Sequence, residues 1–311
     1  MKKPTNDKHL YNYPEYIEYA LGKIKEIDTF KISFSDLTKT IRDYIGGIPV
    51  IENTFKAGTY VARARTKSND LPYKNLSEIT LRDKKYVTSF GRAHRPNRAI
   101  FYCATDHEVA IKEATQWHIT DLGVLINRKM LKDYNPHTRF VTVSIWKVKE
   151  DLKLASLFLN DKAMESNSRV KYFGENIINQ NENNWNENFL KSKNMILKFF
   201  SDEYAKSDIK QESDYFLSAY YANEIHTFSE STGKIDGVVY PSVAHEFKGE
   251  NFAITETAYK NKLEFVKAYH NYVANVELND RPIAVGEISE TIDNQNGKLT
   301  WKDIPTGKII E

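Results

Sequence analysis

A short apolar segment joined directly to a helix-start signal is the feature that most constrains this fold. Residues 99–103, with the sequence AIFYC, are almost all apolar, which is typical of a buried strand. Thr105 to Glu108 then match the Ser/Thr-x-x-Glu pattern that caps the start of many helices. The chain therefore combines strands and helices, and Cys103 in this strand is expected to be a buried, inert thiol.

The helix predicted after this strand carries a carboxylate on its apolar side. At about 100° per residue, one side of the helix gathers four apolar residues: Val109, Ala110, Ala114 and Trp117. Glu113 falls within this arc, whereas Glu108 and Lys112 lie opposite it on the predicted solvent face, with Gln116 at its edge. An unpaired buried carboxylate is unfavourable, so Glu113 needs a cation, a hydroxyl group or a ligand. Taken alone, an ion pair with a nearby arginine is the simpler explanation.

Bulk composition limits the class of protein. The 311 residues are enough for one large domain or two ordinary ones, and the net charge of +2 gives no overall attraction to nucleic acid or membrane. The single cysteine excludes an internal disulfide and favours a reducing compartment. No signal-peptide pattern and no apolar run of about 18 residues occurs. We therefore expect a cytoplasmic protein that does not span a membrane.

The chain is predicted to have three parts. Residues 1–56 show helical spacing and are expected to form a helical lead-in. Residues 57–272 are expected to form the main domain, interrupted by an asparagine-rich helical insertion at about 160–212. Residues 273–311 are expected to form a C-terminal tail.

The last hundred residues carry three local predictions. A buried strand at residues 235–241 ends at proline and places Ser242 at its C-terminal end, where ligand-facing side chains are common, although a simple turn role is commoner. Residues 262–273 are predicted to be helical. Residues 283–301 are predicted to form a short hairpin with its turn at residues 294–297.

Two arginines offer the best phosphate ligands. Residues 59–65 alternate as a strand does, so Arg63 and Arg65 share one face. They either form a solvated face or hold phosphate, whose geometry a guanidinium matches bidentately. The glycine-rich phosphate loops and the HExxH and GxSxG motifs are all missing, and the histidines do not cluster as metal ligands do. Phosphate binding must then rest on side-chain cations, which Arg63, Arg65 and Arg92 supply, and no metal is expected.

Three separated segments together resemble the RES domain, a family named for its Arg, Glu and Ser. They are YVARAR around Arg63, GRAHRPNRAIFY followed by Glu113, and DGVVYPSVAHEFKGENFAI around Ser242. The helical segment DYFLSAYYANEI before the last of these is also similar, and the likeness covers roughly residues 57–258. One departure is His94, because many relatives have Asn at this position. Any hydrogen bond that this Asn supplies in the relatives is not expected here.

The resemblance implies an α+β fold similar to that of ADP-ribosyltransferases, with a mixed β core, flanking helices and NAD bound as substrate in a cleft. Family members are typically toxins of toxin–antitoxin pairs. Some cleave or phosphorolyse NAD, and others are reported to ADP-ribosylate a protein. The matching site positions are Arg63, Arg92, Tyr102, Glu113 and Ser242, with Arg65 and Asn251 as supporting candidates.

The chemistry of the nicotinamide–ribose bond suits this set. Nicotinamide leaves as a neutral base and the ribose passes through an oxocarbenium-like state, so one carboxylate suffices. Glu113 would bind the ribose hydroxyls and offset the positive charge. Arg63 and Arg92 would hold the pyrophosphate, Tyr102 would flank the nicotinamide ring, and Ser242 would orient the ribose or the carboxamide.

Three functions remain open at this level. The first is an NAD phosphorylase or glycohydrolase, and the second is an ADP-ribosyltransferase with a protein target. The third is a non-catalytic nucleotide- or RNA-binding module, which Glu113 on the inner face disfavours because it would repel phosphate. A toxin also implies an antitoxin partner. The chain shows no DNA-binding motif, so no direct nucleic-acid binding is expected.

Overall fold

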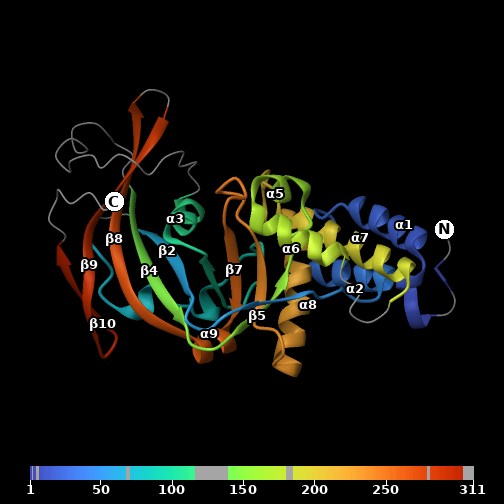
Figure 1. The fold of residues 1–311 in the computed structure, drawn as a ribbon, viewed down its shortest axis with the longest axis horizontal. Helices are drawn as coiled ribbons and strands as arrows, with labels where there is room; N and C mark the ends of the chain where they lie inside the picture. Colours follow the sequence, from blue (N-terminus) through green and yellow to red (C-terminus); the bar gives the residue numbers. More distant parts are fainter. Residues whose placement is uncertain are drawn as a thin grey trace. The chain divides into compact units, whose positions relative to one another are not determined.

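The structure is a computed structural model, and it divides into two compact units, each assembled from three stretches of sequence. It describes residues 1, 3–4, 7–67, 71–115, 139–179, 185–278 and 281–303. The first unit, here called the helical unit, comprises residues 1–54, 83–100 and 153–248. The second, the sheet unit, comprises residues 55–82, 101–152 and 249–311. Both contain helices and strands, so the chain is an α+β protein (Figure 1). The division into lead-in, main domain and tail stays a prediction.

The helical unit carries most of the helices among the described residues. They are α1 (Pro14–Lys25), α2 (Phe34–Ile45), α5 (Asp161–Ser166), α6 (Ser168–Asn179), α7 (Glu187–Tyr204) and α8 (Phe216–Thr232), with short 3₁₀ turns at Asp7–Asn12, Lys84–Tyr86 and Glu212–Tyr215. Asparagines start two of these helices: the Asn160 side chain accepts from Ala163 N, and that of Asn186 accepts from Phe189 N. The predicted helical character of residues 160–212 is confirmed by α5 to α7. That these residues form an insertion stays a prediction, and most of the asparagine-rich run lies outside the described residues.

Aromatic side chains fill the centre of this unit. Phe200 on α7 lies 5.1 Å from Tyr221 and 5.9 Å from Tyr220 of α8, measured between ring centroids. Tyr204, at the end of α7, lies 4.8 Å from Tyr240. All five rings are buried, and burial of an apolar ring such as that of Phe200 stabilises the fold by about 1.5–3 kcal/mol. Part of the chain's high aromatic content thus serves packing.

Three short strands complete the helical unit. They are β1 (Glu52–Phe55), β5 (Leu152–Ser156) and β6 (Gly237–Pro241), hydrogen-bonded in the order β1-β5-β6. β5 and β6 run parallel, with Ser156 opposite Val239. Every residue of β6 is buried, as its continuous apolar sequence predicts.

The sheet unit is built on strands in the order β7-β3-β2-β4-β8-β9-β10. Their bounds are β2 Tyr60–Lys67, β3 Ile100–Ala104, β4 Arg139–Val148, β7 Glu250–Thr255, β8 Leu263–Leu278, β9 Arg281–Gln295 and β10 Lys298–Asp303. The pairs from β3 through β2, β4, β8 and β9 to β10 are all antiparallel. The unit also contains α3 (His107–Thr115), α9 (Glu256–Lys262) and a 3₁₀ turn at Leu76–Glu78. Cys103 on β3 is buried, and burial raises the pKa of its thiol, as expected for an inert cysteine.

The helix predicted at residues 262–273 is wrong, because this segment is strand β8. It pairs with β4 from Leu263 opposite Val148 to Val273 opposite Arg139. Its aromatic and β-branched residues favour a strand, and a strand partner outweighs weak helical spacing. The helix forms just before it, as α9, where Thr255 caps the start by accepting from Ala258 N.

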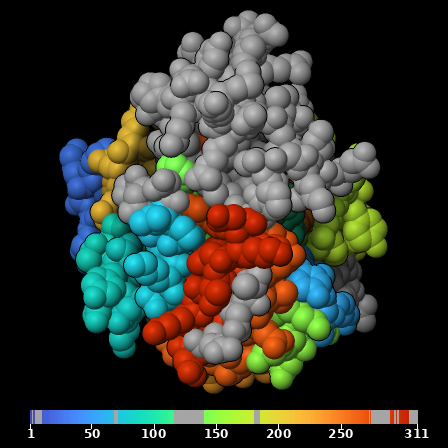
Figure 2. Space-filling view, turned by 90° about the vertical axis from the view of Figure 1, so that its left-hand side faces the viewer, coloured from blue at the N-terminus to red at the C-terminus, as the bar shows by residue number. Residues whose placement is uncertain are grey.

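The predicted C-terminal hairpin is confirmed as β9 and β10. Its turn contains Asn296 at φ 52° and Gly297 at φ 77°, the left-handed conformations that an Asn-Gly turn between two strands requires. The segment from Tyr73 to Ile79 lies along β10: Leu76 N donates to Gly297 O at 2.8 Å, and Trp301 Nε1 donates to Tyr73 O at 2.7 Å. Figure 2 shows this segment in cyan beside the red C-terminal strands.

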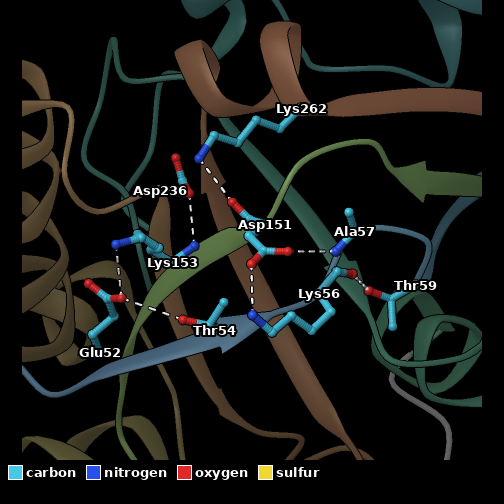
Figure 3. A network of polar contacts seen from close by, with 9 residues as sticks. All are labelled: Glu52, Thr54, Lys56, Ala57, Thr59, Asp151, Lys153, Asp236 and Lys262. Atoms are coloured by element: carbon cyan, nitrogen blue, oxygen red, sulfur yellow. Dashed lines mark hydrogen bonds and ion pairs between the residues drawn. The ribbon is translucent and has the colours of Figure 1, made fainter.

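Asp151, just after β4, forms hydrogen bonds with residues of neighbouring segments of the sheet unit (Figure 3). Its carboxylate accepts from Lys56 Nζ and from Ala57 N, both at 2.9 Å. Its carbonyl accepts from Lys262 Nζ at 3.0 Å. The hydrogen bond from Lys56, followed by that from Ala57, holds the pKa of Asp151 below its usual value.

Candidate active site

The helix that carries the candidate glutamate begins one residue later than the sequence indicates. The Asp106 carboxylate accepts from Val109 N at 3.0 Å, so Asp106 caps α3 and the predicted capping box of Thr105 and Glu108 does not form. Thr105 instead connects α3 to β7, because its hydroxyl accepts from Glu250 N at 3.4 Å. Aspartate is at least as good a cap as threonine, and the shift frees the threonine for this contact.

The inner face of α3 packs on the sheet unit. Val109, Ala110 and Ile111 are buried in a cluster with residues of β2 and β4. Trp117, predicted on the apolar side, and Gln116, predicted at the edge of the solvent face, lie outside the described residues. The predicted position of Lys112 on the solvent face is wrong, because it is only 5% exposed and its Nζ lies 2.9 Å from Glu108 Oε1. A lysine stem can cover apolar surface while its ammonium group keeps an ionic partner.

Glu113 lies half-buried on α3 and is held by an amide. The Asn251 Nδ2 group on β7 donates to Glu113 Oε1 at 2.6 Å. Asn251 itself is 6% exposed, so the bond is shielded from water on the asparagine side. A short hydrogen bond to a carboxylate is stronger than one between neutral groups and fixes the direction of the acid. The Glu113 carboxylate is therefore held against β7 of the sheet unit. This is the inner side of α3, where helical spacing predicts it.

Arg63 on β2 is fixed against the neighbouring strand β3. Its Nη1 donates to the Tyr102 carbonyl at 2.6 Å, and its guanidinium carbon lies 5.0 Å from the centre of the Phe101 ring. Burial, and then the charge of Arg65, lower the pKa of Arg63 to about 9, so the group is still a cation at neutral pH. Among the described residues, its buried Nε–H has no hydrogen-bond partner.

Arg65 and Tyr102 flank Arg63 in the same unit. Arg65 Nη2 donates to the Thr80 carbonyl at 2.8 Å, and burial lowers the pKa of Arg65. Tyr102 is the half-buried residue of β3, whose other four residues are buried. Its carbonyl is the acceptor for Arg63 Nη1.

Arg92 belongs to the helical unit, where its guanidinium group binds carbonyl groups at the C-terminal end of α7. Its Nη1 donates to Tyr204 O at 2.5 Å and its Nη2 to Lys206 O at 2.8 Å. The guanidinium carbon also lies 5.7 Å from the centre of the Tyr215 ring. A cation that binds the last carbonyls of a helix also opposes the negative end of the helix dipole. Arg92 therefore has a structural role that the sequence does not reveal.

Ser242 also belongs to the helical unit and lies fully buried just after β6. Its Oγ accepts from His245 N at 3.2 Å, and its carbonyl accepts from Phe247 N at 2.8 Å. Glu246 and Phe247 in the same turn have positive φ angles of 50° and 64°. This is the local side chain-to-backbone bonding expected of a turn serine.

The structure therefore groups the candidate residues by unit. The sheet unit contains Arg63, Arg65, Tyr102, Glu113 and Asn251, and within it direct bonds join Glu113 to Asn251 and Arg63 to Tyr102. Arg92 and Ser242 lie in the helical unit.

Sequence reasoning missed Gly249, which sets the distance between α3 and the start of β7. A Cβ atom on Gly249 would lie 2.3 Å from Val109 Cγ2, far inside van der Waals contact. Only glycine lets the two elements approach so closely, and this approach brings Asn251 within reach of Glu113. A glycine two residues before a polar strand residue is the only sequence signal, and it is a weak one.

In the described part of the chain, no three His, Cys, Asp or Glu side chains gather where they could hold a metal ion. None of the helices among those residues combines the length and apolarity needed to cross a membrane. No protein-family model and no curated protein matches the sequence.

Proposed function

We propose that this protein cleaves NAD at the bond between nicotinamide and ribose and transfers ADP-ribose to phosphate or water. The observation that carries the proposal is the short bond from Asn251 to Glu113, which holds a half-buried carboxylate in a fixed direction. A carboxylate whose direction is fixed in advance meets the geometric requirement for stabilising charge that develops in a transition state.

The carboxylate would act on the charge that develops in the sugar. As the bond to nicotinamide lengthens, its electron pair moves to the ring nitrogen, and the ribose carbon becomes positively charged. Glu113 would offset this charge and bind a ribose hydroxyl, and Asn251 would act as a positioning residue that keeps the acid oriented. Because the base leaves neutral, no second carboxylate is needed as general acid.

The arginines of the same unit supply the positive charge that a pyrophosphate needs. Arg63 is a cation at neutral pH and is held in place by the β3 main chain. Arg65 adds a second guanidinium two residues away on β2. The two phosphates of NAD are negatively charged, and guanidinium groups match their oxygens bidentately.

Arg92 and Ser242 enter the proposal with dual roles. A guanidinium has five N–H donors, and the bonds from Arg92 to the end of α7 use two of them. The Ser242 hydroxyl accepts a backbone N–H. The proposed ligand roles are those expected from the sequence: Arg92 holds the pyrophosphate, and Ser242 orients the ribose or the carboxamide.

A protein with this activity would deplete the NAD of its own cell. We therefore also propose that the chain is a toxin that works in the cytoplasm, held inactive by an antitoxin partner.

Product analysis tests the proposed activity. Purified protein is mixed with NAD, with and without phosphate, and the products are separated by liquid chromatography. Free nicotinamide is expected in both reactions, with ADP-ribose 1″-phosphate appearing only with phosphate if phosphate is the acceptor. Nicotinamide release accompanied by a mass increase on a protein would identify a transferase instead. Unchanged NAD in every reaction would contradict the proposal.

A further inference from the structure

A third arginine, Arg82, joins Arg63 and Arg65 within the sheet unit. Arg63 and Arg65 are two residues apart on β2, so they lie on the same face of the strand. Arg65 Nη2 donates to the Thr80 carbonyl at 2.8 Å, and Arg82 follows Thr80 by two residues, a span of at most about 7 Å. Burial, and to a smaller extent the charge of Arg82, lower the pKa of Arg65. The three guanidinium groups therefore form one cluster of positive charge.

No carboxylate balances this cluster within the described part of the chain. Arg63 and Arg65 bind main-chain carbonyls, and no ion pair there includes Arg82. Arg98 of the helical unit shows the usual alternative, because its Nη1 lies 3.1 Å from Glu230 Oε1. Like charges that gather without a counter-charge repel one another, and an anion bound among them would remove that cost.

The acidic residues that lie nearest to Arg82 in the sequence are bound elsewhere. Glu78 Oε2 accepts from Asn75 N at 2.8 Å. Asp83 Oδ1 accepts from Lys85 N at 3.0 Å, and its Oδ2 lies 3.4 Å from Lys85 Nζ. Each of these carboxylates thus stabilises a short turn of its own, and neither is the partner of Arg82.

The neighbouring strand adds no negative charge to the cluster. On β4, Ser144 lies opposite Arg63 and Thr142 lies opposite Arg65, so the cross-strand neighbours carry hydroxyl groups. Arg63 and Arg65 are half-buried, whereas Arg82 is exposed. A ligand from solution can therefore reach the cluster at Arg82, and partial burial of the other two arginines strengthens their attraction for an anion.

The number of cations indicates what kind of anion would fit. A single carboxylate balances only one guanidinium group. A diphosphate carries at least two negative charges on two linked groups, and the oxygens of each group match the planar fork of a guanidinium. Three guanidinium groups in one place therefore suit a diphosphate better than they suit a simple carboxylate.

We propose that Arg82 is a ligand-binding residue, and that with Arg63 and Arg65 it holds the diphosphate group of a nucleotide. The assignment of this diphosphate to NAD rests on the proposed function. The charge argument itself holds for any ligand that carries a diphosphate.

Titration calorimetry of the full chain with ADP and with inorganic pyrophosphate tests the proposal. Arg82→Gln should weaken the binding of both by about tenfold, the effect of losing a hydrogen bond between charged groups. Arg169→Gln is the matched control, because it removes the same charge from an exposed position on α6 of the helical unit. It should bind both ligands as the parent does. Adenosine, which has no phosphate, should show no difference between the parent and Arg82→Gln.

Three results would overturn the proposal. They are no ADP binding by the parent at millimolar concentration, unchanged ADP affinity in Arg82→Gln, and an equal loss of ADP affinity in Arg169→Gln. A separate assay of nicotinamide release distinguishes this proposal from the proposed function. If the parent binds ADP through Arg82 but leaves NAD intact, the diphosphate site stands and the cleavage of NAD does not. If the parent cleaves NAD while Arg82→Gln binds NAD and ADP as the parent does, the role of Arg82 is refuted instead.

Discussion

The close approach of α3 to Gly249 gives the most quantitative prediction. In Gly249→Ala, the new Cβ would lie 2.3 Å from Val109 Cγ2 and 3.3 Å from Thr105 Oγ1. Carbon atoms pack best at about 3.5–4.0 Å, so the methyl groups would overlap by more than an ångström. Val109 is 1% exposed, and its branched side chain has little rotamer freedom in a helix, so it cannot turn away. Relief requires α3 to shift.

The expected cost follows from this overlap. Overpacking of a buried contact destabilises a protein by about 1–3 kcal/mol, and we expect that loss in the free energy of unfolding of Gly249→Ala. Val109→Ala alone should cost about 2 kcal/mol through the two methyl groups it removes. In the double variant the clashing Cγ2 atom is absent, and the remaining Cβ–Cβ distance of 3.5 Å is an ordinary contact. The double variant should therefore be more stable than the sum of the single losses by about 1–3 kcal/mol.

Urea unfolding of the parent, both single variants and the double variant measures this coupling. Nicotinamide release by the same four proteins connects the packing to the site, because a shift of α3 moves Glu113 away from Asn251. The activity should fall in Gly249→Ala and partly return in the double variant. Strictly additive stabilities, or a Gly249→Ala variant as stable as the parent, would refute the steric argument.

Three further predictions concern single side chains. Arg92→Ala should lower the free energy of unfolding by about 2 kcal/mol in urea, because it removes two charged hydrogen bonds from the end of α7; an unchanged value would mean that the bonds contribute nothing. Burial lowers the pKa of His226 from 6.5 to about 3, so between these values the unfolded chain binds a proton that the folded protein excludes. Stability should fall as the pH drops below 6.5, by up to about 1.4 kcal/mol per pH unit, and His226→Gln should flatten that slope in acid unfolding curves. Asn251→Asp would set a second carboxylate beside Glu113, raising the pKa of the pair, so its stability relative to the parent should fall as pH rises above about 4; a parallel pH profile would argue against the contact.

Local patterns predicted those features that depend on neighbours in sequence. The strands around Arg63 and Phe101, the helix carrying Glu113 and the final hairpin follow from alternation, helical spacing and an Asn-Gly turn. Each of these signals is contained within about ten residues. The inward position of Glu113 is another feature that local sequence predicts, because it depends only on helical geometry.

The errors and omissions depend on partners distant in sequence. Residues 262–273 form a strand because β4 pairs with them, and β4 lies more than a hundred residues earlier. Asn251 lies 138 residues from Glu113, and Arg92 lies 112 residues from the Tyr204 carbonyl that it binds. No spacing rule reports such contacts, so the sequence indicates which groups are polar but not which bonds they make.

The rate of nicotinamide release by Glu113→Gln tests the central claim most directly. Glu256→Gln is the control, because it removes a carboxylate that lies at the exposed start of α9, 2.6 Å from Lys260 Nζ. We predict that Glu113→Gln binds NAD as the parent does but releases nicotinamide at least about a hundredfold more slowly, whereas Glu256→Gln keeps the parent rate. A Glu113→Gln variant that releases nicotinamide as fast as the parent would contradict the assignment of this carboxylate to the reaction.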